Sequence, residues 1–119
     1  MLDAGCHEGA YYLTGYAVEC ALKACIARKT QQHDFPDRKL VSQVFTHNLS
    51  SLVRAAGLES DLIGEIRSHP DFSDNWEVTK LWAEESRYDP NISAQAAQDL
   101  YNAVADPTAG VLAWLKKYW

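Results

Sequence analysis

The chain has 119 residues, of which 47% are hydrophobic and 23% charged, the size and composition of a single globular domain, residues 1–119. The formal net charge of −5, with 11 Lys and Arg against 16 Asp and Glu, argues against strong binding to duplex DNA and leaves open a local basic cleft. No stretch approaches the roughly 18 consecutive apolar residues of a membrane span, so the sequence predicts no contact with a membrane.

The cysteines and the N-terminal residues indicate the cellular compartment in which the protein works. Residues 1–5 lack the basic and apolar regions of a secretory signal. The three cysteines, Cys6, Cys20 and Cys25, form no Cys-x-x-Cys motif and indicate neither a disulfide framework nor a zinc knuckle. Cys20 and Cys25 fall in an apolar helical run, where we expect two small buried thiols. These features predict a cytoplasmic protein.

Residues 9–28 contain no proline and are rich in Ala, which predicts a long helix. Its polar stripe is narrow, because Gly15, Glu19 and Lys23 recur at i, i+4 and i+8 and most other positions are apolar. A helix of this kind is central in a bundle or lies at a subunit interface, so we expect a homodimer. Glu19 and Lys23 would form either a surface pair or a pair partly buried at that interface.

The middle of the chain predicts short helices. Residues 29–39 are polar and contain a proline, which favours a loop, and residues 40–45 are expected to be loop or a helical turn. A helix capped by Thr46 or Asn48 then runs to Gly57. Its expected buried residues are Leu49, Leu52 and Val53. A second short helix, residues 59–67, ends before Pro70, and its expected apolar residues are Leu62, Ile63 and Ile66.

The second half of the chain predicts two longer helices. The first begins at Asp71 or Ser73 and runs to about Ser86. Its expected apolar face is Phe72, Trp76, Thr79 and Ala83, widened by Val78, Leu81 and Trp82. Residues 92–119 form the last helix, in which Pro107 either introduces a kink or restarts the helix with Asp106 as N-cap. Its expected apolar residues are Ala94, Ala97, Tyr101, Val104, Ala105, Val111, Leu112, Trp114 and Leu115.

These elements predict an all-α protein, an antiparallel up-and-down bundle of about five helices without a sheet. The sequence contains no glycine-rich phosphate loop and no serine nucleophile elbow. It also contains no His-Glu-x-x-His motif and no close cluster of His and carboxylates. We therefore expect neither a metal nor a cofactor.

Three segments in order resemble the HEPN domain family (higher eukaryotes and prokaryotes nucleotide-binding). Residues 12–24, YLTGYAVECALKA, resemble its core helix. Residues 46–52, Thr-His-Asn-Leu-x-x-Leu, resemble its Thr-His-Asp-Leu-x-x-Leu step, and residues 82–88, WAEESRY, resemble its late Arg-Tyr element. The resemblance covers most of residues 9–118, although only about ten residues precede the core helix, where the family has a fuller first helix. It implies a four- or five-helix bundle that is usually a homodimer.

The family divides into metal-independent RNases, often toxins, and non-catalytic partners of minimal nucleotidyltransferases. The RNases carry Arg-x(4 to 6)-His on a late helix, where His can act as general acid or base and Arg can stabilise transition-state charge. In this chain Arg28 and His33 have that spacing, but Arg28 ends the core helix and His33 lies in the polar loop after it, and Arg87 has no His four to six residues later. Arg28 and His33 are thus weak catalytic candidates, and the catalytic residues stay unassigned.

The ligand-binding candidates are His47, Arg87, Tyr88, Glu19 and Lys23. His47 could instead cap its own helix, Arg87 could form an ion pair with Glu84, and Tyr88 could pack at the helix end. The favoured interpretation is a non-catalytic partner of a nucleotidyltransferase or of a toxin–antitoxin-type system that handles nucleotide or RNA. The alternatives are a metal-independent RNase toxin and a helical interaction module without a ligand.

Overall fold

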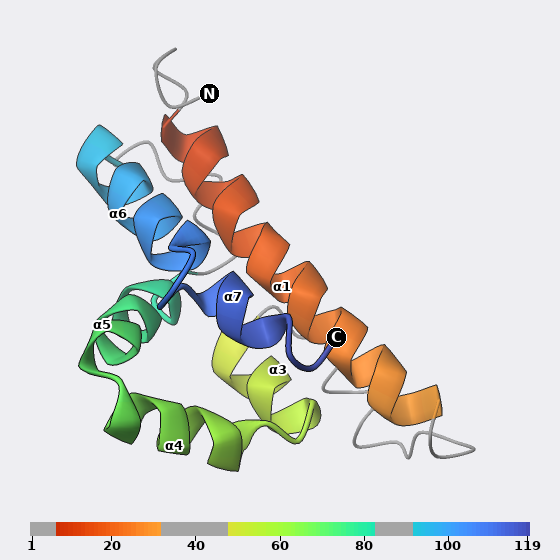
Figure 1. Cartoon of the computed structure of the whole chain (residues 1–119). Coiled ribbons are helices and arrows are strands. Elements are labelled where there is room, and N and C mark those ends of the chain that lie inside the picture. The colour runs from red at the N-terminus through yellow and green to blue at the C-terminus, as the bar shows by residue number, and fades with distance from the viewer. Residues whose placement is uncertain (1–6, 32–47, 83–91) are drawn as a thin grey trace.

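A computed structural model of the chain describes residues 7–31, 48–82 and 92–119, and every regular element within them is a helix (Figure 1). These are α1 (His7–Gln31), α3 (Leu49–Ala55), α4 (Glu59–Ser68), α5 (Pro70–Thr79), α6 (Ala94–Ala105) and α7 (Val111–Leu115). The predicted small helical bundle is confirmed, with six helices in the described part of the chain rather than about five. None of the described helices is long and apolar enough to span a bilayer.

The longest helix, α1, lies along one edge of the molecule and packs against α6, α3 and α7 (Figure 1). α5 packs against α6, and α4 packs against α5 on the side away from α1. The C-terminal end of the chain lies beside α1 (Figure 1). The largest fully buried apolar side chains come from α1, α3, α5, α6 and α7, namely Val18, Leu22, Leu49, Leu52, Val53, Phe72, Leu100, Val104, Val111 and Leu115.

α1 extends beyond the predicted residues 9–28 at both ends. Gly15, predicted to lie on a polar stripe, is buried, because the indole of Trp82 lies directly over it. A Cβ atom at position 15 would overlap the indole ring. The Trp82 ring also lies against that of Tyr12, with centroids 5.9 Å apart. Gly15 therefore provides the space in which the segment after α5 docks on α1.

The two predicted end signals of α3 are confirmed. Asn48 is the N-cap, and its Oδ1 accepts a hydrogen bond of 3.0 Å from the backbone N–H of Ser51. Gly57 follows the helix with a positive φ of 73°, which glycine adopts without strain. Thr46, the other predicted cap, lies outside the described residues.

α5 begins and ends differently from the prediction. Pro70 is its first residue, where the missing N–H has no helical partner to lose. The helix ends at Thr79 rather than near Ser86, and Leu81, 74% exposed, does not belong to the apolar face. Phe72, Trp76 and Thr79 are buried as predicted. Their burial fixes α5 between α4 and α6.

The predicted interruption near Pro107 is a turn that separates two helices, so the chain is neither kinked there nor capped by Asp106 at α7, whose N-cap is Gly110. Asp106 Oδ1 accepts hydrogen bonds from the backbone N–H groups of Thr108 (2.9 Å) and Ala109 (3.1 Å). The buried face of α6 is Ala97, Leu100, Ala103 and Val104. The prediction was wrong for Ala94, Tyr101 and Ala105, which are exposed.

The turn at Asp106 gives a pH-dependent contribution to stability. Its pKa is lowered from 3.8 by the backbone hydrogen bonds of Thr108 and Ala109 and the hydroxyl of Thr108. We expect Asp106→Ala to lower the melting temperature at neutral pH, where the carboxylate is charged. The difference from wild type should shrink as the pH falls below 3.8 and the folded carboxyl is protonated.

Thermal unfolding followed by circular dichroism across the acid range measures this effect. Asp99→Ala is the matched control, because that exposed carboxylate accepts a hydrogen bond from the Gln95 side chain one turn earlier and, among the described residues, none from a backbone N–H. Equal melting temperatures of Asp106→Ala and wild type at neutral pH would contradict the assigned role of the turn.

Candidate functional site

The structure describes only part of the predicted site. Glu19, Lys23 and Arg28 all lie on α1. The remaining candidates lie outside the described residues: His33, His47, Arg87 and Tyr88. Their proposed roles stay predictions.

Glu19 and Lys23 form an ion pair inside the fold. The Glu19 side chain is buried, with the whole residue 1% exposed, and Lys23 Nζ lies 3.3 Å from its Oε2. The surface alternative is therefore wrong for Glu19, and its burial comes from the chain's own helices rather than from a second subunit. Neither residue lines the two cavities described below. In the folded chain this pair neutralises a buried charge, which would be costly without a partner.

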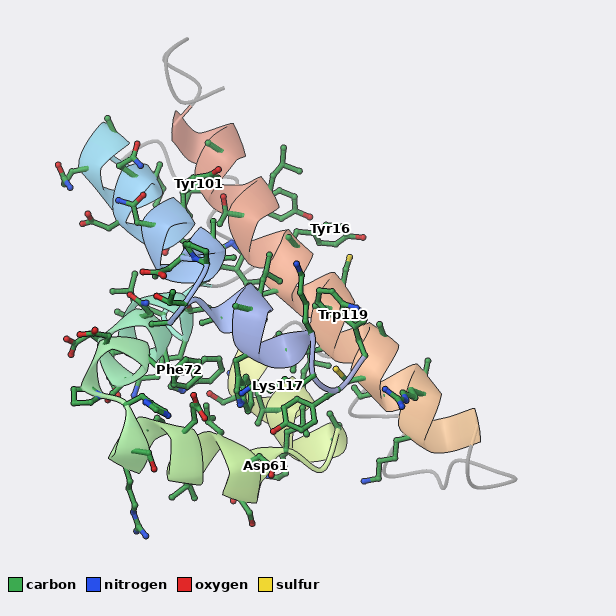
Figure 2. The ribbon with its side chains drawn as sticks, viewed as in Figure 1. Tyr16, Asp61, Phe72, Tyr101, Lys117 and Trp119 are labelled. Atoms are coloured by element: carbon green, nitrogen blue, oxygen red, sulfur yellow. The ribbon has the colours of Figure 1, made fainter. Side chains whose placement is uncertain are left out.

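A cavity of about 270 Å³ lies where the end of α1 meets the end of α3 and the segment after α7. We call it the basic pocket. Figure 2 labels Lys117 and Trp119 on the C-terminal segment, which reaches back to α1. The lining residues are Cys25, Arg28, Lys29, Ala56, Leu58, Lys117 and Tyr118.

Local interactions place the cations of the basic pocket. Arg28 and Lys29 are in the last turn of α1, where positive charge is favourable against the helix dipole. Arg28 Nη1 donates a hydrogen bond of 3.1 Å to a main-chain oxygen of Trp119, the last of the 119 residues, where this oxygen belongs to a carboxylate. The Lys29 side chain lies over Gly57, where a Cβ atom would come within 2.9 Å of the Lys29 Nζ. The absence of a side chain at position 57 thus lets Lys29 extend across the end of α3.

The basic pocket combines a cationic rim with an uncharged floor. Arg28, Lys29 and Lys117 are exposed, and none of the described lining residues has a carboxylate side chain. Burial raises the pKa of the Cys25 thiol, a shift that the nearby Arg28 charge partly opposes, so the thiol is neutral at pH 7. Burial also raises the pKa of Tyr118, helped by the Asp61 carboxylate. The pocket can therefore attract an anion, and the raised pKa values of Cys25 and Tyr118 make neither group an acid–base catalyst near neutral pH.

A second cavity, of about 380 Å³, lies between the α4–α5 junction and the turn before α7. It is lined by both signs of charge, and His69 Nε2 lies 3.7 Å from Glu65 Oε1. Within residues 7–31, 48–82 and 92–119, no three His, Cys, Asp or Glu side chains are grouped as metal ligands would be. We regard this cavity as a surface hollow that contains an ion pair, and we assign no ligand to it.

The outward side of α1 is apolar. Leu13 is 48% and Tyr16 42% exposed, and Figure 2 shows Tyr16 directed away from the other helices. Exposed residues continue along this side of the helix at Ala17, Cys20, Ala24 and Ala27. We call these six residues the outer face of α1. The prediction of two buried thiols is confirmed for Cys25 and wrong for Cys20.

Sequence reasoning identified Arg28 but missed Lys29 and Lys117 as members of the same site. The available signal was two basic dipeptides, Arg28-Lys29 and Lys116-Lys117, far apart in the chain. Comparisons of the chain with protein-family models, curated proteins and solved structures gave no match.

Proposed function

We propose that the protein is a non-catalytic, HEPN-like domain that acts by binding. It would work in the cytoplasm as a homodimer, as the nucleotide- or RNA-handling partner of a minimal nucleotidyltransferase or of a toxin–antitoxin-type system. The observation that carries this proposal is the outer face of α1. It is an apolar surface on the same helix whose inner side builds the core.

The composition of the outer face of α1 favours binding to a partner. Its exposed residues from Leu13 to Ala27 carry no charge, whereas the surface of α4 includes Glu59, Asp61 and Arg67. Contiguous apolar surface on a water-exposed helix is typical of an interaction site. The small alanines would let a second helix approach closely, and a two-fold axis would place the same face of a second copy against it.

The basic pocket supports a binding role over catalysis. Metal-independent cleavage of RNA needs a proton donor or acceptor beside the group that stabilises the phosphate. Arg28 could stabilise the phosphate, but among the residues that the structure describes its pocket is lined by neither a His nor a carboxylate side chain, and His33 lies outside those residues. The Arg28 guanidinium also bonds a terminal oxygen of Trp119. This arrangement suits retention of an anion without bond cleavage.

The test of the proposed association is Ala17→Glu. We expect wild type to sediment as a dimer and the variant as a monomer, with dissociation favoured by about 100-fold or more, because an unpaired charge in an interface costs about 3 kcal/mol or more. Since Ala17 is exposed in the single chain, the melting temperature of the monomer should show that it is folded. Analytical ultracentrifugation at high micromolar concentration measures both species.

Ser60→Glu is the matched control, because it adds the same charge at an exposed position of α4. A wild-type monomer, or a dimer that survives Ala17→Glu, would remove the outer face of α1 as the interface. Cleavage of RNA in EDTA by the wild-type protein would contradict the non-catalytic assignment.

A further inference from the structure

We propose that the basic pocket binds a small phosphate ester of about mononucleotide size, with its phosphate held by Arg28, Lys29 and Lys117. This inference deepens the nucleotide-handling part of the proposed function and rests on it for the choice of a nucleotide as probe. The surface involved is distinct from the outer face of α1, so the two can be tested separately.

The two lysines of the basic pocket have no ion pair within the described residues. There, Lys23, Arg54 and Lys80 lie at ion-pair distance from Glu19, Glu59 and Glu77, and His69 lies near Glu65. Lys29 and Lys117 have no such partner in the same part of the chain, whereas Arg28 bonds a terminal main-chain oxygen of Trp119, which carries carboxylate charge at this chain end. Two lysines without an ion pair therefore meet beside Arg28 at one cavity of a protein whose net charge is −5. A phosphate would supply a counter-charge to these lysines.

The donors of the basic pocket have a geometry that suits phosphate. Arg28 uses one of its five N–H groups on the terminal oxygen of Trp119, which holds the guanidinium at the rim and leaves other donors for a ligand. A planar guanidinium can bind two phosphate oxygens at once, and lysine ammonium groups add charge from either side. Lys29 and Lys117 come from opposite ends of the chain and line the same cavity.

The size of the basic pocket and the chemistry of its floor suit a small ligand. The volume of about 270 Å³ is just below the range of about 300–1,000 Å³ typical of small-molecule sites. The floor is formed by buried Cys25, Ala56 and Leu58, and Tyr118 also lines the cavity. A small phosphate ester fits these surfaces, with its phosphate at the cationic rim and its partly apolar group on the floor. A long RNA strand is larger than this cavity.

Isothermal titration calorimetry on the full chain at low salt tests the inference. The probes are adenosine monophosphate, inorganic phosphate and adenosine. We expect adenosine monophosphate to bind, phosphate to bind more weakly and adenosine to give no heat. Lys29→Gln and Lys117→Gln should each weaken binding of adenosine monophosphate by about tenfold or more, as expected for loss of a charge-assisted hydrogen bond.

Lys116→Gln is the matched control, because it removes the same charge from the neighbouring exposed residue that does not line the pocket. Its affinity should stay within about twofold of wild type, as for an exposed charge outside the site. No binding of either phosphate probe up to millimolar concentration overturns the inference. The inference is also overturned if Lys116→Gln and Lys117→Gln lose affinity for adenosine monophosphate equally. It is overturned as well if the protein binds an RNA oligonucleotide but not adenosine monophosphate.

Sedimentation of the same samples separates the two proposals. A dimer that binds no phosphate probe removes the pocket and leaves the association through α1. A monomer that binds adenosine monophosphate through Lys29 and Lys117 removes the association through α1 and leaves the pocket.

Discussion

Gly15→Ala should destabilise the protein by about 2 kcal/mol, whereas Gly64→Ala should stabilise it by about 0.5–1 kcal/mol. Both glycines lie inside helices, so both replacements gain the same helical propensity. A Cβ atom at Gly64 meets nothing within 4 Å, while a Cβ atom at Gly15 would overlap the Trp82 indole. Because the two replacements should change the stability in opposite directions, their comparison separates the steric conflict at Gly15 from the shared change in backbone entropy.

The conflict at Gly15 can be assigned to one partner by a double-mutant cycle. Trp82 is buried against α1, and Trp82→Ala alone should cost about 3–5 kcal/mol. In that background Gly15→Ala should become neutral or stabilising, because the overlapping ring is gone. Urea unfolding of the four proteins gives the coupling energy. If the Gly15→Ala variant is as stable as the Gly64→Ala variant while Trp82 is present, the indole does not pack closely on α1 at position 15.

Trp114→Ala should destabilise the fold by about 3–5 kcal/mol, the range for loss of a large buried aromatic side chain. Trp114 lies between Phe72 of α5 and Tyr118, with ring centroids 5.4 Å and 5.5 Å away. α7 has only five residues and has no stability of its own, so its position depends on this aromatic packing. The variant should therefore loosen the segment that carries Lys117 and Tyr118 into the basic pocket.

Trp119→Ala is the control for the Trp114 variant, since Trp119 is 42% exposed. We expect it to cost about 1 kcal/mol or less, as for most surface changes. Chemical denaturation followed by far-ultraviolet circular dichroism reports both variants. Equal losses in the two tryptophan variants would show that Trp114 does not organise the C-terminal part of the core.

Signals that act locally were predicted well from the sequence. Asn48 caps α3, and Gly57 ends it, because a cap and a positive φ depend on a few adjacent residues. The face of Phe72, Trp76 and Thr79 followed from helical spacing alone. The helical class of the protein was predictable for the same reason.

Features that depend on distant parts of the chain were not predictable. Leu100 rather than Tyr101 faces the core of α6, a one-position choice that the surrounding helices decide. Gly15 and Glu19 were predicted on a narrow polar stripe, with Glu19 either at the surface or partly buried at a subunit interface. In the structure Trp82 lies over Gly15, and Glu19 is buried within the chain. The basic pocket is the extreme case, because its cations at Lys29 and Lys117 meet only through the packing of α1 with α7.

The packing of α1 has a consequence for folding during synthesis. α1 precedes the other described helices, yet two of the helices that pack on it, α6 and α7, come last among them. The hydrogen bond from Arg28 to Trp119 joins residues 91 positions apart. The side of α1 that packs on α6 and α7 therefore stays uncovered until these two helices have been made, and such non-local contacts form late. A chain that stops before α6 would expose this apolar side and become a client of chaperones and proteases.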